Sequence, residues 1–219
     1  MAEHTLRAGH VAAHFDDAEQ QFDAARLGMW TFLATEVLFF GGLFLVYAIY
    51  RAAYPEAFAE GSHHLHLVLG AVNTGVLLCS SLSMALAVRA AQTNQRRQLI
   101  LFLILTILFG AAFLGVKAYE YYEKYHDHLM PLLGLPFVWE GPHADQVRLF
   151  YGLYFAMTGF HALHMVIGIG VLLGLLVLSW RGWFSSEYYT PVEMVGLYWH
   201  FVDIVWVFLY PLLYLIHGA

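Results

Sequence analysis

The chain has 219 residues, of which 60% are hydrophobic, 17% aromatic and only 12% charged, and its mean hydropathy is +0.62. A soluble domain carries about 25% charged residues, so this composition excludes a soluble globular enzyme and a disordered chain and indicates a membrane protein. The net charge of −6 argues against nucleic acid as a partner, and the single cysteine excludes a disulfide scaffold or a multi-cysteine metal motif.

Five stretches are apolar and long enough to cross a membrane as helices, which takes about 20 residues each. None alternates in polarity as a transmembrane strand would. The fourth stretch is too long for a perpendicular span, so it should tilt or project from the membrane. We predict an all-α bundle of five transmembrane helices over residues 27–219, after a polar tail over residues 1–26, with spans at about 27–50, 67–88, 99–120, 149–180 and 194–216.

Five spans place the termini on opposite sides of the membrane, and the distribution of Lys and Arg predicts which side is cytoplasmic. The arginines Arg89, Arg96 and Arg97 cluster in one short loop on the same side as the N-terminus. We therefore predict a cytoplasmic N-terminus and a C-terminus outside. Residues 1–26 match neither a secretory signal nor a mitochondrial presequence, so the expected location is a prokaryotic plasma membrane.

Ionisable residues at membrane depth are costly, and each one is therefore a functional hypothesis. Glu36 lies in the middle of the first span. It could handle protons or bind a lipid head group, or it could make a structural hydrogen bond to another helix. The sequence alone favours neither interpretation.

The third span continues into a polar and aromatic extension. Lys117 and Glu120 are three residues apart, one helical turn, and can form an ion pair. The tyrosines around them are typical of an aromatic belt at the membrane boundary. We interpret this extension as a helix end that leaves the bilayer, with Glu120 kept as a proton- or lipid-related candidate. The connection that follows contains an apolar stretch, residues 130–139, whose prolines disfavour a helix, and we expect it in the interface or against a partner.

Histidines on the fourth and fifth spans raise the question of a metal or haem site. His161, His164 and Gly168 are spaced to share one helix face, and His200 on the last span is the natural third ligand. A metal needs further converging ligands, and haem needs facing axial histidines, such as His161 with His200. We favour hydrogen-bonded core histidines over either kind of site.

The last span carries a buried acid close to a histidine. Asp203 lies three residues after His200, a spacing that suggests a polar network binding this helix to its neighbours. Such a network could be structural or part of a proton relay. From the residues alone the chain could be a transporter, a haem protein or an accessory subunit, although an odd number of spans without a midplane break disfavours a transporter.

Four segments then match one family in order. The chain resembles subunit III of the haem-copper respiratory oxidases, which include cytochrome c and quinol oxidases, and the resemblance covers residues 22–219. The matching segments are residues 26–29 with 35–40, residues 73–81, residues 119–123, and residues 158–164 followed by 198–206.

The resemblance implies an accessory subunit of a proton-pumping terminal oxidase that reduces oxygen to water. It implies that the chain carries no catalytic centre, cofactor or metal of its own, that subunits I and II are its partners and hold haem and copper, and that it binds structural phospholipid and supports proton uptake. Glu36 matches a membrane-embedded glutamate of that family. The longest members have two further spans that form one wall of a lipid cleft. Related five-span proteins belong to quinol oxidases and nitric oxide reductases, which remain alternatives, as does a stand-alone proton or solute transporter.

Overall fold

The computed structural model describes residue 12, residues 14–131 and residues 135–216. The predicted membrane-spanning helices are confirmed, because five helices in this part of the chain are long and apolar enough to cross a membrane. A short sixth helix, α3, was not predicted. The helices are α2 (Ala18–Ala53), α3 (Pro55–His63), α4 (Leu67–Gln92), α5 (Arg96–His126), α6 (Ala144–Arg181) and α7 (Thr190–Tyr214).

Local sequence signals explain where several helices begin and end. α2 begins well before the apolar span, at Ala18, because the Asp17 side chain accepts a hydrogen bond from the Gln20 N–H at 2.7 Å and caps the helix. α2 and α3 are separated at Tyr54, where the following proline, Pro55, disfavours helical backbone and starts the new helix. Most of the predicted polar tail, residues 1–11 and 13, lies outside the described residues.

The longest helix, α6, has 38 residues and therefore extends about 57 Å at 1.5 Å per residue, well beyond the roughly 30 Å of a bilayer core. Its length agrees with the expected tilt or projection. It ends at Gly182, whose φ of 78° suits glycine. Arg96, at the start of α5, donates hydrogen bonds to the last carbonyls of α6, those of Ser179 and Trp180.

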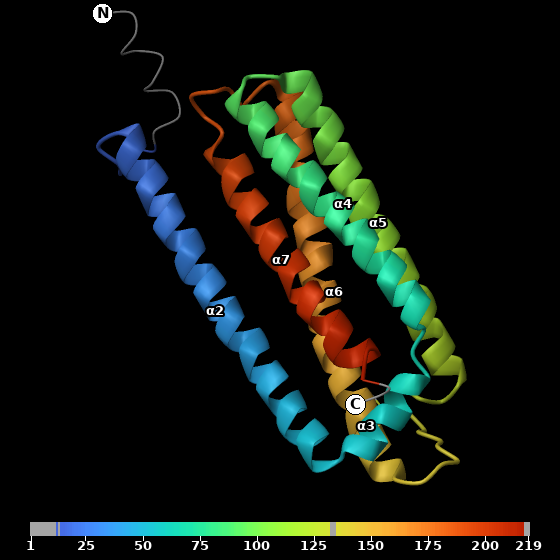
Figure 1. Cartoon of the computed structure of the whole chain (residues 1–219). Coiled ribbons are helices and arrows are strands. Elements are labelled where there is room, and N and C mark those ends of the chain that lie inside the picture. The colour runs from blue at the N-terminus through green and yellow to red at the C-terminus, as the bar shows by residue number, and fades with distance from the viewer. Residues whose placement is uncertain (1–11, 13, 132–134, 217–219) are drawn as a thin grey trace, which may run out of the picture.

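Four helices, α4 to α7, form an antiparallel bundle, and α2 lies beside it against α6 and α7 (Figure 1). α3 crosses one end of the bundle, which we call the α3 end. The buried residues of α2 are Leu33, Phe40 and Tyr47, which follow one another at intervals of seven positions. α2 therefore contacts the bundle along a narrow stripe. Its other faces are exposed.

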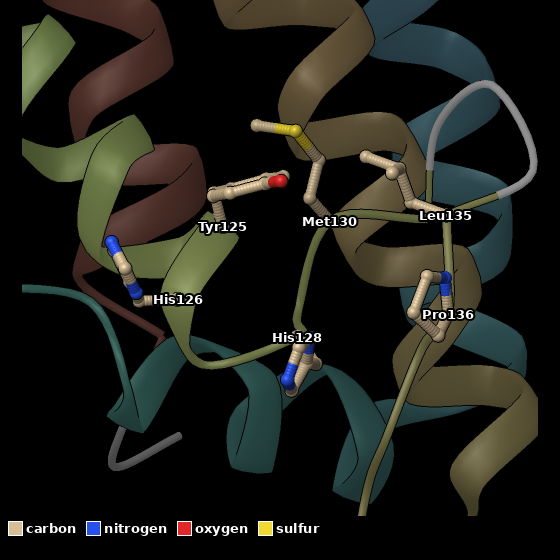
Figure 2. A pocket seen from close by; sticks show the side chains of 6 residues that line it. All are labelled: Tyr125, His126, His128, Met130, Leu135 and Pro136. Carbon is tan, nitrogen blue, oxygen red and sulfur yellow. The ribbon is translucent and has the colours of Figure 1, made fainter.

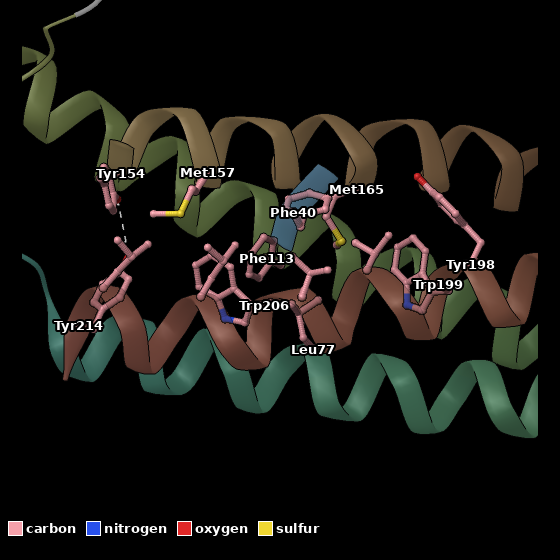
Figure 3. Close-up of a cluster of buried hydrophobic side chains, with 14 of the residues drawn as sticks. Phe40, Leu77, Phe113, Tyr154, Met157, Met165, Tyr198, Trp199, Trp206 and Tyr214 are labelled. Carbon is pink, nitrogen blue, oxygen red and sulfur yellow. Dashed lines mark hydrogen bonds between the residues drawn. The ribbon is translucent and has the colours of Figure 1, made fainter. Parts of the chain in front are cut away.

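Aromatic side chains fill the interior of the four-helix bundle (Figure 3). Trp199 and Trp206 on α7 are fully buried, and their ring N–H groups each donate to a hydroxyl of α4, Ser80 and Thr74, at 3.0 Å. Gly168 on α6 faces Trp199 so closely that a Cβ there would lie 2.9 Å from the indole. Glycine at this position thus lets α6 and α7 approach each other.

The apolar stretch after α5 packs in part against the protein's own core. Residues 132–134 lie outside the described residues, but Met130, Phe137 and Trp139 pack against the chain's own core. The Phe137 ring lies 6.1 Å from that of Tyr151 on α6, and Trp139 lies 4.9 Å from His64. These side chains therefore cover the α3 end of their own bundle, and the expected place of this stretch in the membrane interface or against a partner stays a prediction.

Candidate functional site

Glu36 and His164 meet between α2 and α6. The Glu36 Oε2 atom lies 3.0 Å from His164 Nε2, and His164 Nδ1 lies 2.7 Å from the Phe160 carbonyl oxygen, one turn earlier on α6. The Tyr198 hydroxyl of α7 donates to the His164 carbonyl at 2.9 Å. Three helices therefore position this pair.

The hydrogen bonds decide where protons can sit in the pair. A backbone carbonyl only accepts, so His164 Nδ1 must carry a hydrogen and donate it to Phe160. The contact between Nε2 and Glu36 then needs a second proton, either on the imidazole or on the carboxyl. In both cases the two side chains share one proton and have no net charge, which is the cheapest state for an acid at membrane depth.

The surroundings of the pair are apolar but not closed. The Phe40 ring lies 5.4 Å from the His164 ring, and Phe39 of α2 makes an edge contact with Phe160 of α6 at 5.0 Å. The side chains of Glu36 and His164 are nevertheless 17% and 14% exposed. The pair can thus be reached from the membrane side of the α2–α6 contact, by lipid or by a neighbouring subunit.

His161 points elsewhere, so the idea that it shares a ligand-binding face with His164 is wrong. Its ring is buried in the four-helix bundle between Phe113 and Trp206, with centroid distances of 5.4 and 5.2 Å. Neither ring nitrogen has a hydrogen-bond partner among the described residues. A three-residue step rotates a helix by about 300°, and here that difference places the two side chains against different neighbours.

His200 and Asp203 occupy a third place, at the contact of α7 with α4. His200 Nδ1 lies 2.8 Å from the Ser81 hydroxyl. Asp203 is buried, and Ser81 is its polar neighbour, but neither carboxylate oxygen makes a hydrogen bond within the described chain. No direct Asp203–His200 bond is formed.

The disfavoured alternative, with His200 as a third ligand, gains no support, because the three membrane histidines lie at three different helix contacts. Among the described residues no three His, Cys, Asp or Glu side chains converge on a possible metal position.

A second polar cluster lies nearer the α3 end. Lys117 and Glu120 form the predicted ion pair, with Nζ 2.5 Å from Oε2. The position of this helix end relative to the bilayer stays a prediction, but both side chains are almost completely buried inside the protein. The reason is that Tyr154 of α6 and Tyr214 of α7 cover the pair and accept hydrogen bonds from Lys117 at 3.0 and 2.9 Å.

The Lys117 ammonium is fully satisfied in this cluster. Its three N–H donors are taken by one carboxylate and two hydroxyls, and four aromatic rings lie within 5.6 Å of Nζ, those of Tyr121, Tyr154, Trp206 and Tyr214. Tyr214 also donates to Glu120 at 3.0 Å. The cluster ties α5, α6 and α7 together. The tyrosines of the predicted belt that do face outward are Tyr119, Tyr122 and Tyr125.

Sequence reasoning missed the partners of this cluster. The available signal was a Lys and a Glu one turn apart inside a run of tyrosines at the end of an apolar span. The tyrosines that matter, Tyr154 and Tyr214, are on other helices, so only the packing reveals them.

Two open pockets lie at the α3 end. One, of about 170 Å³, is lined by Tyr125, His126, His128, Met130, Leu135 and Pro136, and Figure 2 shows its histidines well apart from each other. The other, of about 600 Å³, lies beside the ion pair of His66 with Glu123, whose atoms are 2.9 Å apart. Neither pocket includes Glu36, His164 or any other predicted site residue.

Comparison with known proteins gives one family. The family model described as "Cytochrome c oxidase subunit III" matches residues 9–218. A protein of Thermostichus vulcanus named cytochrome c oxidase subunit 3 is 32% identical over 213 residues, 97% of each chain. Proteins of the same name are 35% identical in Synechocystis, covering 89% of this chain and 76% of the relative, and 33% identical in Corynebacterium diphtheriae, covering 87% of each.

Proposed function

The chain belongs to the cytochrome c oxidase subunit III family and is an accessory subunit of a terminal oxidase in the plasma membrane, and we propose that its Glu36–His164 pair supports proton uptake while the exposed faces of α2 bind phospholipid. The observation that carries the proposal is the 3.0 Å contact between Glu36 Oε2 and His164 Nε2 in the apolar span of α2. The catalytic centre, haem and copper belong to the partner subunits I and II in this proposal.

The pair suits a role in proton transfer because one proton can lie on either of its two members without changing the net charge. Moving it from carboxyl to imidazole forms two adjacent opposite charges, whose attraction offsets part of the cost of creating charge in an apolar site. Partial exposure lets a water molecule or a group of another subunit exchange that proton. His161, His200, Asp203 and Glu120 face other interfaces, and we assign them to holding the bundle.

Lipid binding is supported by the small contact of α2 with its own chain. Of the 18 residues that form the apolar part of α2, only 17% are buried inside the structure, against 56% of the corresponding residues of α7. A Cβ atom added at Gly28, Gly41 or Gly42 would have no neighbouring atom of the protein within 4 Å. The Leu38 side chain on the same helix is exposed. An apolar helix with so little cover from its own chain must be covered by acyl chains or by a partner helix in the complex.

The arginines also agree with the proposed orientation. Arg89, Arg96 and Arg97 lie at the end of the bundle opposite α3. On the α3 side, Lys117 and Lys124 are buried and paired within the protein, and Arg51 and the exposed Arg148 are the other cations among the described residues. We therefore place the α3 end outside and the N-terminus in the cytoplasm.

The test uses the purified oxidase complex with Glu36→Gln, which keeps the size of the side chain but removes its acid. We expect complete assembly, a lower ratio of protons pumped per electron during sustained turnover in liposomes, and a normal initial rate of oxygen reduction. The matched control is Glu56→Gln, whose side chain is 85% exposed at the α3 end, and which should behave as wild type. Unchanged pumping by the Glu36→Gln complex would refute the proton role.

Lipid binding is measured separately by extracting and quantifying phospholipid from the same preparations. Replacing Leu38 by Asn on the exposed face of α2 should lower the number of retained phospholipids without altering pumping per electron in the first turnovers. Equal lipid content in this variant and in wild type would contradict lipid binding at α2.

A further inference from the structure

Asp203 of α7 is a buried acid without a hydrogen-bond donor. The residue is only 3% exposed, and both carboxyl oxygens are inaccessible and make no hydrogen bond within the described part of the chain. An ionised carboxylate inside a protein is stabilised by a nearby cation or by several N–H or O–H donors. The surroundings of Asp203 therefore decide whether it can carry a charge.

Most donors at the contact of α7 with α4 are committed to other acceptors. Trp199, one turn before Asp203, donates its ring N–H to Ser80, and Trp206, one turn after it, donates to Thr74. The hydroxyls of Ser80 and Thr74 donate in turn to backbone carbonyls. These four side chains thus have no polar hydrogen left for the carboxyl.

The remaining polar neighbour, the Ser81 hydroxyl of α4, cannot hold an ionised Asp203 on its own. It lies next to the carboxyl, but its oxygen is also 2.8 Å from His200 Nδ1. If Ser81 donates to His200, it has no hydrogen for the carboxyl. If His200 donates instead, Ser81 offers one neutral hydrogen bond to a buried charge, and burying a charge costs far more than one such bond returns.

No positive charge of the described chain compensates the carboxyl either, since none of its ion pairs includes Asp203. Charged groups in the neighbouring helices are bound to one another, Glu36 of α2 with His164 of α6 and Lys117 with Glu120 on α5. The other titratable neighbours on these helices are occupied or uncharged: His161 packs between aromatic rings, Tyr198 donates to a backbone carbonyl, and Cys79 is an exposed thiol.

We propose that Asp203 is a proton-binding site of the assembled subunit, in which it carries its proton and joins the α4–α7 contact as a neutral carboxylic acid. A neutral acid brings its own O–H donor, and the Ser81 oxygen beside it is an acceptor. α4 and α7 are then linked without a buried charge. This proton is separate from that of the Glu36–His164 pair, which lies between α2 and α6, and its presence does not depend on the proton role proposed for that pair.

The direct test is solid-state NMR of the purified oxidase complex in lipid, with carbon-13 in the aspartate carboxyl groups. The signal of Asp203 is the one that Asp203→Asn removes. The matched control is Asp127→Asn, which identifies the signal of an aspartate whose side chain is 56% exposed. At neutral pH we expect the Asp203 carbon at the position of a protonated carboxyl and the Asp127 carbon at that of a carboxylate. An ionised signal for Asp203 would overturn the proposal. If Asp203→Asn does not assemble, Asp203→Glu removes the same labelled signal and takes its place in the assignment.

The pH dependence of stability gives an independent readout in the same complex. Unfolding releases the proton of Asp203, because an aspartate in an unfolded chain is ionised above about pH 6. Raising the pH therefore favours unfolding of the wild type, and from about pH 6 to 7 the ratio of its unfolding equilibrium constant to that of Asp203→Asn should rise about tenfold. The corresponding ratio for Asp127→Asn should stay constant, because that acid is ionised in both states. A constant ratio for Asp203→Asn as well would contradict a proton on Asp203.

Discussion

Replacing Glu120 by Gln tests how the buried cluster near the α3 end stabilises the protein. The substitution preserves the size of the side chain and an oxygen for Tyr214, but it removes the carboxylate that lies against Lys117. The amine of Lys117 would then either stay charged without a carboxylate in a nearly dry site or give up its proton, and both states are costly. Removing one member of a buried ion pair costs about 3–5 kcal/mol.

That cost should be visible as loss of the subunit from the purified complex in a detergent titration, because about 3 kcal/mol corresponds to a more than hundred-fold change in an equilibrium constant. Glu123→Gln is the matched control. It makes the same chemical change one turn later on α5, in a partly exposed pair with His66, and should cost at most about 1 kcal/mol.

A double variant separates the charge effect from the loss of packing. Lys117→Met with Glu120→Gln removes the uncompensated ammonium, and Met fills much of the space among the aromatic rings. We expect this pair of changes to destabilise the subunit less than Glu120→Gln alone. If the double variant is lost at a lower detergent concentration than either single variant, the cluster does not act through a buried charge and the reasoning is wrong.

Two further predictions concern the contacts of α7. Gly168→Ala should destabilise the subunit by about 1–3 kcal/mol, because the new methyl group would lie 2.9 Å from the Trp199 ring. The measurement is the melting temperature, which should fall. The control is Gly170→Ala, whose methyl group would meet no atom within 4 Å and should leave the melting temperature unchanged or raise it. Ser81→Ala should cost about 0.5–1.5 kcal/mol in the same assay, since it removes one hydrogen bond of the partly buried His200. Wild-type melting of Ser81→Ala would show that this bond contributes nothing.

The helical architecture could be predicted because apolar length is a local property of the sequence. Each span needed only about 20 consecutive apolar residues, and all five were found. The missed helix, α3, has only nine residues and no apolar run. It is held by contacts with α6 and by the hydrogen bond from Lys124 to the His64 carbonyl, which no local pattern reveals.

The polar sites were predictable as residues but not as pairs. Membrane depth marked Glu36, and the structure shows its partner to be His164, 128 positions away. Helical spacing grouped His161 with His164. In the structure, however, His164 packs against α2, whereas His161 packs against α5 and α7. Spacing on one helix defines a face only to within a wide angle, and the neighbouring helices determine which side chains meet.

The placement of the Glu36–His164 pair follows from the way α2 is attached. A helix that buries only Leu33, Phe40 and Tyr47 against its bundle gains limited packing energy. The Glu36–His164 pair, between Leu33 and Phe40, and the hydrogen bond from the Tyr47 hydroxyl to the Leu212 carbonyl add specific attachment. The same narrow contact leaves the pair partly accessible from the membrane. A more deeply packed helix would have sealed the acid from any proton donor, and a looser one would have left it unpaired in lipid. In the proposed function, the thin α2 contact is what holds the Glu36–His164 pair together and leaves it partly exposed to the rest of the oxidase.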